Sequence, residues 1–443
     1  MNKSVVVITH NMIPHSNSWG GCQRIYYLSC YLQEKGYDVT VFSCYQDALN
    51  TFNNTIPFKT KAIKVKNMIV RRFLLSNQNN GQILSATEKE VKSTANSFVV
   101  RLKKNKLIRN LLRTVDDFIY NEPSSFTGPL SRSWRSASRN EIIQYVIKNE
   151  VKNIVISAPP FGIFSISKDI RKRLKNNVNI IFDYRDPWNL WDGGSVVSRS
   201  MEKSFLRFAD RIVCTNEYLA ADMAKSFRIP ESKFLTVANG YSEASWKLIS
   251  SKKTCNEKMV ITYVGTISLH HESSYRNVTE LFNAFERILK ECKHIELRFV
   301  GIVNSESKDV NEARERFKDF IQIVGVVSNE ESLEHMIVSD VLLLLHTTED
   351  SSSKYIVSGK MYDYIKANKP IFSIGNKDGI HCRMIQENNL GIHSENKKED
   401  LYRCLLQLYD EWSESNLSTF TRNSDTYTYS REYQNEKYLK LLK

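Results

Sequence analysis

Short apolar runs alternate with amphipathic segments along most of the chain. In the first half, nearly continuous apolar runs occur at 5–10, 37–44, 153–160, 178–188, 211–216 and 234–240. Segments with helical spacing lie between most of them, notably 21–36, 141–150 and 217–227. Strands that are apolar on both faces and separated by helices are typical of a parallel, doubly wound sheet.

The alternation repeats in the second half. Strands are predicted at 260–267, 295–302, 320–327, 340–346 and 369–375, and helices at 278–292, 329–340, 360–367 and 398–412. A polar stretch at 245–258 lies between the two halves and is interpreted as a linker. We therefore expect an α/β protein with two Rossmann-like domains, at 1–245 and 255–425, and a last amphipathic segment at 426–443.

Segment 45–135 breaks the alternation because it is polar, basic and poor in clear strands. Between Pro57 and Arg113, fourteen Lys or Arg residues face two acids, Glu88 and Glu90, so this stretch holds nearly all of the net charge of +13. It is too long for a bare loop, so we expect a partly helical basic insert in the first domain. The count predicts one basic patch and not a generally basic surface.

The composition is that of a soluble globular chain, with 41% hydrophobic and 25% charged residues in 443 positions. No apolar run approaches the roughly 18 residues that a membrane span requires. The N-terminus runs into a strand-like segment without a signal-peptide cleavage site. The eight cysteines form no CxxC pair and the nine histidines lack ligand spacing, so we expect a cytoplasmic protein with reduced thiols and no metal site.

Candidate ligand-binding residues follow the predicted strands, because open parallel sheets bind ligands beyond the carboxyl ends of their strands. In the two halves these positions include His10, Ser157, Asp183, Asp186, Gly265, Thr266, Gly301, Gly325 and His346. Taken singly, each is more often ordinary turn chemistry. Gly20 and Gly21, at the start of the first predicted helix, either allow close approach of a phosphate or simply cap the helix.

The sequence DYRDPW at 183–188 places two carboxylates and a guanidinium directly after a strand. It is compatible with a local salt bridge that orders the loop and with polar groups presented to a sugar hydroxyl. The chain has no DxD motif, so a metal-dependent sugar-nucleotide site of that type has no support.

The stretch SGKMYDYIKANKPI at 358–371 places a glycine and a lysine at a predicted helix start. A P-loop would need a glycine at position 354 and Ser or Thr at position 361, where the chain has Lys354 and Met361. The P-loop interpretation therefore fails. A helix N-terminus beside a lysine is still suited to bind an anion.

Taken together, these segments resemble the retaining glycosyltransferases of the GT-B fold, family-4 type, over roughly 1–44 and 135–443. The resemblance rests on the order and spacing of GGCQRIYYLSCYLQEKGYDVTVFS, ADRIVCTNEYLAADM, VANGYSEASW, YVGTI, VGVVSNEESLEHMIVSDVLLLL and SGKMYDYIKANKPI. It implies two Rossmann-like domains facing each other across a cleft, with the donor on the C-terminal domain and the acceptor on the N-terminal one. It also implies that the last helix, in 426–443, crosses back to the first domain.

The resemblance implies roles for individual residues. Arg276 falls near a basic residue that meets the donor diphosphate, and Lys360 lies with Ser358 and Gly359 on the phosphate-facing helix start. Asp363 matches the second acid of the family's E-x7-E motif, which hydrogen-bonds the ribose, and Val326 lies where backbone groups meet the base. Further expected donor contacts are Gly20, Gly21, Gly265 and Thr266. Two positions depart from the family pattern: Tyr355 stands where the first acid is expected, and Thr266 where an arginine often follows YVG.

A departing nucleoside diphosphate gains negative charge as the glycosidic bond breaks. Two fixed cations, Arg276 and Lys360, and a helix N-terminus would stabilise that charge without a metal. The family implies retention by front-face attack, so no enzymic nucleophile is required, and Asp183 and Asp186 are expected to orient the sugar or acceptor. No cofactor is expected, because the nucleotide sugar, a UDP- or GDP-sugar, is itself the substrate.

Within the basic insert, residues 103–119 carry an apolar helical stripe with Lys104, Lys106, Arg109 and Arg113 outside it. This pattern fits a core-packed helix with a solvated face. It also fits an interfacial helix on an anionic membrane surface, with 57–119 as the membrane-binding segment. A nucleic-acid partner is not expected, since no recognised nucleic-acid module appears.

The sequence thus predicts a cytoplasmic glycosyltransferase, peripheral on the inner face of the cell membrane, with a glycan or lipid-linked acceptor. Its product would be a surface polysaccharide, such as capsule or lipopolysaccharide, or a glycolipid. Two alternatives remain open. A nucleotide-sugar epimerase of the GT-B fold would interconvert the sugar without an acceptor, and a non-catalytic nucleotide-sugar-binding protein would be consistent with Tyr355.

Overall fold

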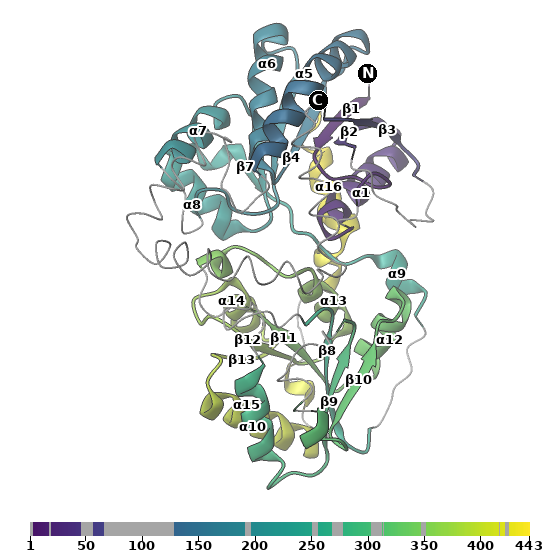
Figure 1. The fold of residues 1–443 in the computed structure, drawn as a ribbon, viewed down its shortest axis with the longest axis vertical. Coiled ribbons are helices and arrows are strands. Elements are labelled where there is room, and N and C mark those ends of the chain that lie inside the picture. The colour runs from purple at the N-terminus through teal and green to yellow at the C-terminus, as the bar shows by residue number, and fades with distance from the viewer. Residues whose placement is uncertain are drawn as a thin grey trace, which may run out of the picture. The chain divides into compact units, whose positions relative to one another are not determined.

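The computed structural model describes residues 3–16, 19–45, 56–65, 128–190, 196–249, 256–267, 278–302, 312, 314–346, 351–415, 417–420 and 425–443 (Figure 1). The chain divides into two compact units, which are Met1–Val237 with Asn435–Lys443 (unit 1) and Ala238–Gln434 (unit 2). The boundary after Val237 lies earlier than the predicted linker at 245–258. The chain returns to unit 1 at Asn435, which is later than the predicted start of the last segment at residue 426.

Unit 1 contains a seven-stranded, fully parallel sheet in the order β3-β2-β1-β4-β5-β6-β7. The strands are β1 (Ser4–Thr9), β2 (Asp38–Cys44), β3 (Lys59–Ile63), β4 (Asn153–Ala158), β5 (Asn179–Tyr184), β6 (Arg211–Cys214) and β7 (Phe234–Thr236). Every residue of β1, β4 and β5 is buried, as their continuous apolar runs predict. The predicted doubly wound sheet is confirmed.

Two elements of unit 1 extend into the segment that the sequence placed in the basic insert. The polar strand β3 pairs with β2 at the edge of the sheet, where a strand needs little apolar content. The helix α5 (Gly128–Lys148) begins well before the predicted start at 141. The insert is therefore shorter than 45–135, and the predicted helix at 103–119 lies outside the described residues.

The other helices of unit 1 are α1 (Trp19–Glu34), α6 (Ile166–Leu174), α7 (Val196–Leu206) and α8 (Glu217–Phe227), with short 3-10 turns η1 (Phe161–Ser165) and η2 (Glu231–Lys233). The last helix, α16 (Arg431–Leu439), enters unit 1 at Asn435. One apolar cluster joins α1, the five strands β1, β2, β4, β5 and β6, and Tyr438 of α16. Burial of this kind supplies most of the stabilisation of such a layer.

Unit 2 contains a six-stranded parallel sheet in the order β10-β9-β8-β11-β12-β13. The strands are β8 (Met259–Val264), β9 (Ile295–Val300), β10 (Ile321–Gly325), β11 (Val341–Leu345), β12 (Ile371–Ile374) and β13 (Gly391–Ser394). The helices are α9 (Glu243–Lys247), α10 (Thr279–Ile288), α12 (Asn329–Val338), α13 (Gly359–Ala367), α14 (Ile380–Glu387) and α15 (Lys398–Ser413), with 3-10 turns η3 (Ser351–Lys354), η4 (Leu417–Phe420) and η5 (Thr426–Tyr429). The sequence did not predict β13 or α14, which are short and only partly apolar.

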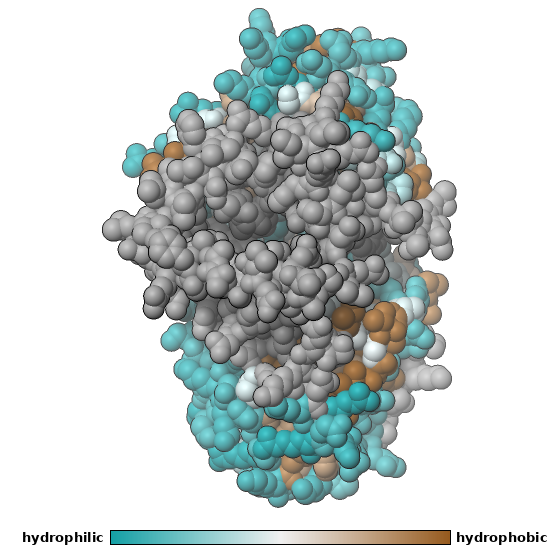
Figure 2. All heavy atoms as spheres, viewed as in Figure 1, coloured by the Kyte–Doolittle hydropathy of each residue, from teal (hydrophilic) through white to brown (hydrophobic). Residues whose placement is uncertain are grey.

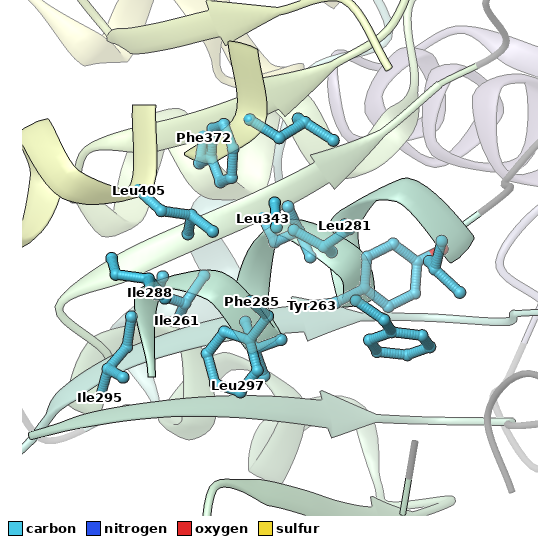
Figure 3. Packing of buried hydrophobic residues seen from close by; sticks show 14 of the residues in the cluster. Ile261, Tyr263, Leu281, Phe285, Ile288, Ile295, Leu297, Leu343, Phe372 and Leu405 are labelled. Atoms are coloured by element: carbon cyan, nitrogen blue, oxygen red, sulfur yellow. The ribbon is translucent and has the colours of Figure 1, made fainter. Parts of the chain in front are cut away.

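The core of unit 2 lies between its sheet and the helices α10 and α15. In Figure 3, Ile261, Leu297 and Leu343 from the strands face Phe285 of α10 and Leu405 of α15. The buried positions of α10 recur every three or four residues, which is the spacing of one helix face. This packing fixes the sheet whose carboxyl ends carry the candidate site.

Hydrophilic residues predominate among the described residues on the face shown in Figure 2. In the described ranges, no helix has both the length and the apolar character needed to cross a membrane.

A buried carboxylate, Asp183 at the end of β5, links four elements of unit 1. It accepts hydrogen bonds from Arg24 of α1 (Nη2 to Oδ1, 2.9 Å), Ser157 of β4 (Oγ to Oδ2, 2.7 Å) and the hydroxyl of Tyr438 in α16. Burial alone would raise the pKa of Asp183, but the charge of Arg24 and these hydrogen bonds outweigh it and hold the pKa below its ordinary value.

The C-terminal residues are held to the opposite ends of the same strands. Asn153 donates to the backbone carbonyl of Lys443 (3.0 Å) and accepts from its backbone N–H (2.9 Å). Asn179 donates to the carbonyl of Leu441 (2.6 Å). The final segment therefore belongs to unit 1 through specific polar contacts as well as apolar packing.

We expect Asp183→Asn to lower the free energy of unfolding by about 3–5 kcal/mol, because it leaves the buried Arg24 guanidinium without its counter-charge. The matched control is Asp38→Asn, which removes a carboxylate from an exposed pair with Lys59 (2.9 Å) and should cost under about 1 kcal/mol. Urea denaturation followed by circular dichroism measures both. Equal effects of the two substitutions would contradict the structural role of Asp183.

The ion pair between Asp183 and Arg24 also predicts how the free energy of unfolding depends on pH. Because the pKa of Asp183 is lower in the folded state than its unfolded value of about 3.9, its stabilisation is complete above that value. The stabilisation is lost as the pH falls through the folded pKa. The difference in stability between the wild type and Asp183→Asn should therefore shrink in acid, as measured by denaturation at a series of pH values. A difference that stays constant down to the acid limit of folding would refute this assignment.

Candidate functional site

The carboxyl ends of β8, β9, β10 and β11 in unit 2 lie at the edge of the sheet where parallel folds bind ligands. Lys360, the second residue of α13, extends to the end of β8. Its ammonium donates to the hydroxyl of Tyr263 (2.7 Å) and lies 4.0 Å from the centre of that ring. The Tyr263 hydroxyl in turn donates to the carbonyl of Thr266 (3.0 Å), so both contacts fix the position of the cation.

Gly265 makes room for this lysine. Its φ of +129° disfavours any other residue, and a Cβ there would lie 2.4 Å from Lys360 Nζ. Gly301, after β9, has a φ of +120°, and a Cβ there would lie 2.4 Å from the carbonyl oxygen of Gly265. The predicted residues Gly265 and Thr266 thus adjoin Lys360, and Thr266 is exposed.

The start of α13 is positioned by a neutral histidine. The N–H of Ser358, the N-cap residue, donates to Nε2 of His381 in α14 (3.0 Å). Burial lowers the pKa of His381 well below its ordinary value, and His346 and His393 add repulsion. The ring of His346, which follows β11, lies 4.2 Å from that of His381. Because the helix N-terminus carries partial positive charge, Ser358, Gly359 and Lys360 together form a cationic edge.

Asp363 lies one turn after Lys360 on α13. Its Oδ1 accepts from the indole N–H of Trp246 in α9 (3.1 Å). Burial raises the pKa of Asp363, while the hydrogen bond from Trp246 and the charge of Arg431 lower it. Lys366 of α13 also pairs with Glu243 of α9 (2.8 Å). The first residues of the predicted linker are therefore wrongly assigned, since α9 is folded against α13 within unit 2.

Two apolar side chains are exposed beyond neighbouring strands at the same edge. Val326, after β10, is 76% exposed, and Ile302, after β9, is 53% exposed. The backbone N–H of Gly301 donates to the carbonyl of Gly325 (2.7 Å), which keeps the two strand ends together. Exposed apolar groups beside a cationic edge suit a flat heterocycle attached to a phosphate.

Tyr355 and Arg276 were also singled out by the sequence analysis. Tyr355, which replaces the first acid of the motif, is 5% exposed, and Lys354 lies 5.1 Å from its ring centre. It therefore serves as a packed aromatic residue. Arg276 lies outside the described residues.

In unit 1, Gly20 and Gly21 lie in the first turn of α1. The guanidinium of Arg185 donates to the carbonyls of Gly21 and of Pro159. It thereby joins the start of α1 to the ends of β4 and β5. Arg185 therefore orders this loop through backbone carbonyls of other segments, whereas the sequence is compatible with a local salt bridge within DYRDPW.

The two acids of DYRDPW are not equivalent. Asp183 lies in the core with no exposed surface, so its predicted role in orienting a sugar does not fit its position. Asp186 is only partly covered. Burial raises the pKa of Asp186, opposed by the charges of Arg185 and Arg24. Asp186 is thus the acid of this motif that is available to a ligand.

His10, at the end of β1, is buried, which lowers its pKa to about 4.

Sequence reasoning missed Tyr263, His381 and Trp246. Tyr263 lies inside a strand pattern and gives no separate signal. His381 belongs to α14, which was not predicted, although a glycine-rich turn after the strand at 369–375 could have indicated a second helix start. Trp246 was visible as a tryptophan in an otherwise polar stretch, which is unusual for a solvated linker.

Within the described ranges, no group of three or more His, Cys, Asp or Glu residues is arranged to hold a metal ion.

No protein-family model matches the chain, and no curated protein matches it either. Solved structures do match over nearly the full length. The lipopolysaccharide outer core galactosyltransferase WaaB aligns with a TM-score of 0.61 at 11% identity, over 99% of this chain and 98% of that one. Anabaena HepE in complex with UDP and glucose aligns with a TM-score of 0.59 at 9% identity, over 99% and 98%.

A Listeria monocytogenes protein described as a UDP-N-acetylglucosamine 2-epimerase aligns with a TM-score of 0.53 at 10% identity, over 99% of this chain and 95% of that one. Similarity at such identities establishes the fold, and function must be argued from the site. The chain has the two-domain α/β architecture of the GT-B glycosyltransferases.

Proposed function

We propose that the protein is a retaining, nucleotide-sugar-dependent glycosyltransferase. The observation that carries this proposal is the arrangement on α13, where Lys360 is fixed by Tyr263 at the helix start and Asp363 lies one turn later. A cation at a helix N-terminus suits a diphosphate, and a carboxylate one turn away suits a ribose. The fold, shared with glycosyltransferases such as WaaB, supports the same conclusion.

The proposed chemistry follows from charge. As the bond between the sugar and the diphosphate breaks, negative charge grows on the leaving group. Lys360 and the N-terminus of α13 stabilise that charge, and Arg276 supplies a second cation by analogy with the family. We propose that no divalent metal or other cofactor is needed. The acceptor hydroxyl attacks the same face of the sugar, and its proton passes to the leaving phosphate.

The nucleoside would extend from this cationic edge. Asp363 accepts hydrogen bonds from the ribose hydroxyls, with Trp246 holding its carboxylate in place. The base lies near Val326 and Ile302, whose exposed apolar surface it would cover. A UDP-sugar is the donor to test first, because the similar protein HepE binds UDP, and a GDP-sugar is the second.

The acceptor is proposed to bind at unit 1, near the carboxyl ends of its strands. Asp186 orients an acceptor or sugar hydroxyl there, and Asp183 acts only through the core. A glycan or lipid-linked acceptor in the assembly of a surface polysaccharide, at the cytoplasmic face of the membrane, fits the likeness to WaaB. The basic segment 57–119 would contribute to membrane binding.

A second candidate is a nucleotide-sugar epimerase, favoured by the likeness to the Listeria protein. It would convert the donor sugar without any acceptor. A non-catalytic binding protein would bind nucleotide sugars and transfer nothing, and Tyr355 in place of an acid is the feature that favours it. Product analysis with and without a glycan extract separates the three functions.

Lys360→Ala is expected to lower the turnover number by about 10²–10³, since it removes one of the groups that stabilise the leaving diphosphate. Release of nucleoside diphosphate from UDP- and GDP-sugars measures the rate, with and without EDTA. The control is Lys290→Ala, which removes an exposed lysine after α10 and should leave both rate and melting temperature unchanged. Normal turnover by folded Lys360→Ala protein would refute the site.

Tyr263→Phe is expected to reduce kcat by about 10- to 100-fold, because it removes one hydrogen bond to a charged group and keeps the ring beneath Lys360. The loss should appear in kcat more than in KM, because the lysine is needed most as charge develops. In the Lys360→Ala background the substitution should have little further effect. Independent, multiplicative losses in the double variant would show that Tyr263 does not act through Lys360.

A further inference from the structure

A strongly basic pocket lies in unit 1 at the amino ends of β5, β6 and β7. This is the opposite end of the unit 1 sheet from the carboxyl ends that Asp186 follows. The volume of the pocket is about 490 Å³. Six basic residues line it, which are Arg171, Arg207, Arg211, Lys233, Lys440 and Lys443, together with one acid, Asp210. They come from four separate stretches of the chain.

The one acid is fully engaged with the wall of the pocket. Arg171 donates to the carboxylate of Asp210 and to the carbonyls of Phe208 (3.1 Å) and Val178 (2.8 Å). Asp210 also accepts from the backbone N–H of Ile180 (2.7 Å). These two residues neutralise each other and shape the pocket.

The other five cations have no carboxylate partner within the part of the chain that the structure describes. Arg207 and Arg211 are exposed, and Lys233 is half-buried. Burial lowers the pKa of Lys233. The charge of Asp210 opposes this effect, and Arg171 and Arg211 add repulsion. The side chains that line the pocket therefore carry more positive than negative charge.

The backbone of the C-terminal segment, which carries Lys440 and Lys443, is held at the pocket by hydrogen bonds between Asn153 and Lys443 and from Asn179 to the carbonyl of Leu441. The backbone that carries these two lysines is thus ordered before an anion binds, which reduces the entropy lost on binding.

An apolar pocket of about 580 Å³ adjoins the basic one and shares Arg207 and Lys233 with it. Leu206, Phe227, Ile229 and Pro230 line it, with Lys203 and Arg228 among its polar residues. A cationic pocket joined to an apolar one matches a molecule with an anionic head and an apolar tail. A free phosphate would use only the first pocket.

We propose that this end of unit 1 docks on an anionic membrane surface, with lipid phosphate groups in the basic pocket and lipid apolar atoms in the adjoining one. Each basic residue near such a surface contributes about 1 kcal/mol. Nucleic acid is the less suitable occupant, because a duplex would contact only the cations and leave the apolar pocket unfilled, and a single strand binds largely by stacking on exposed aromatic rings. The one aromatic residue of the apolar pocket, Phe227, is buried. The residues that line both pockets belong neither to the donor site of unit 2 nor to segment 57–119.

The test is flotation of the full chain with vesicles of phosphatidylcholine and phosphatidylglycerol, compared with phosphatidylcholine alone. Arg207→Gln with Lys233→Gln should weaken binding to the anionic vesicles by about 30-fold. The matched control is Arg139→Gln with Lys168→Gln, which removes the same two charges from exposed helical sites outside both pockets and should change binding by less than about threefold. Segment 57–119 is present in every variant, so its contribution cancels.

A third variant, Ile229→Ser, tests the apolar pocket. It should weaken vesicle binding, and the melting-temperature shift produced by inorganic phosphate should stay as in the wild type. Equal losses in the two double variants would overturn the proposal in favour of general charge attraction. Phosphate saturation with no vesicle binding, or binding of an oligonucleotide in place of vesicles, would also overturn it. Unchanged melting temperatures and donor turnover establish that all variants are folded.

Discussion

The arrangement of unit 1 depends on one buried carboxylate. Asp183 of β5 draws together α1, β4 and the C-terminal helix, because each of these three elements contributes a donor to it. A buried charge is unfavourable unless it is paired and hydrogen-bonded. Asp183 is paired with Arg24 and hydrogen-bonded by Ser157 and Tyr438, and the C-terminal helix supplies the last of these donors. The return of the chain to its first unit is therefore tied to the electrostatics of the core as well as to apolar packing.

This dependence explains where sequence reasoning about DYRDPW was limited. The motif shows that Asp183 and Asp186 follow a strand, but not which of them points into the sheet and which toward solvent. Asp183 lies within β5, where every residue is buried, whereas Asp186 lies in the bend that follows the strand. The side chain of Asp186 is partly exposed, and Arg24, which pairs with the buried Asp183, lies 159 residues away in the sequence.

The strands that carry the site were predictable from their continuous apolar runs, and Lys360, Gly265 and Asp363 from their positions after or near those strands. The contacts that orient them were not. Tyr263 accepts a hydrogen bond from Lys360, which lies 97 residues away in the sequence. His381 accepts one from Ser358, which lies 23 residues away. Periodicity reports only which face of an element is buried, and β13 and α14 lacked a strong period of their own.

The number of charged residues in the sequence also could not predict the basic pocket of unit 1. Outside the basic insert, acids and bases are nearly balanced in number, which predicted no second basic region. The fold separates them in space. Arg171 and Asp210 satisfy each other, while Arg207, Arg211, Lys233, Lys440 and Lys443 converge on one end of the sheet. A parallel sheet brings all of its amino ends to one edge and all of its carboxyl ends to the other, so one Rossmann-like unit offers two electrostatically independent surfaces. Asp186 lies at one of these edges and the cations of the basic pocket at the other, so the acceptor and the anionic membrane surface that we propose for this unit would occupy different ends of its sheet.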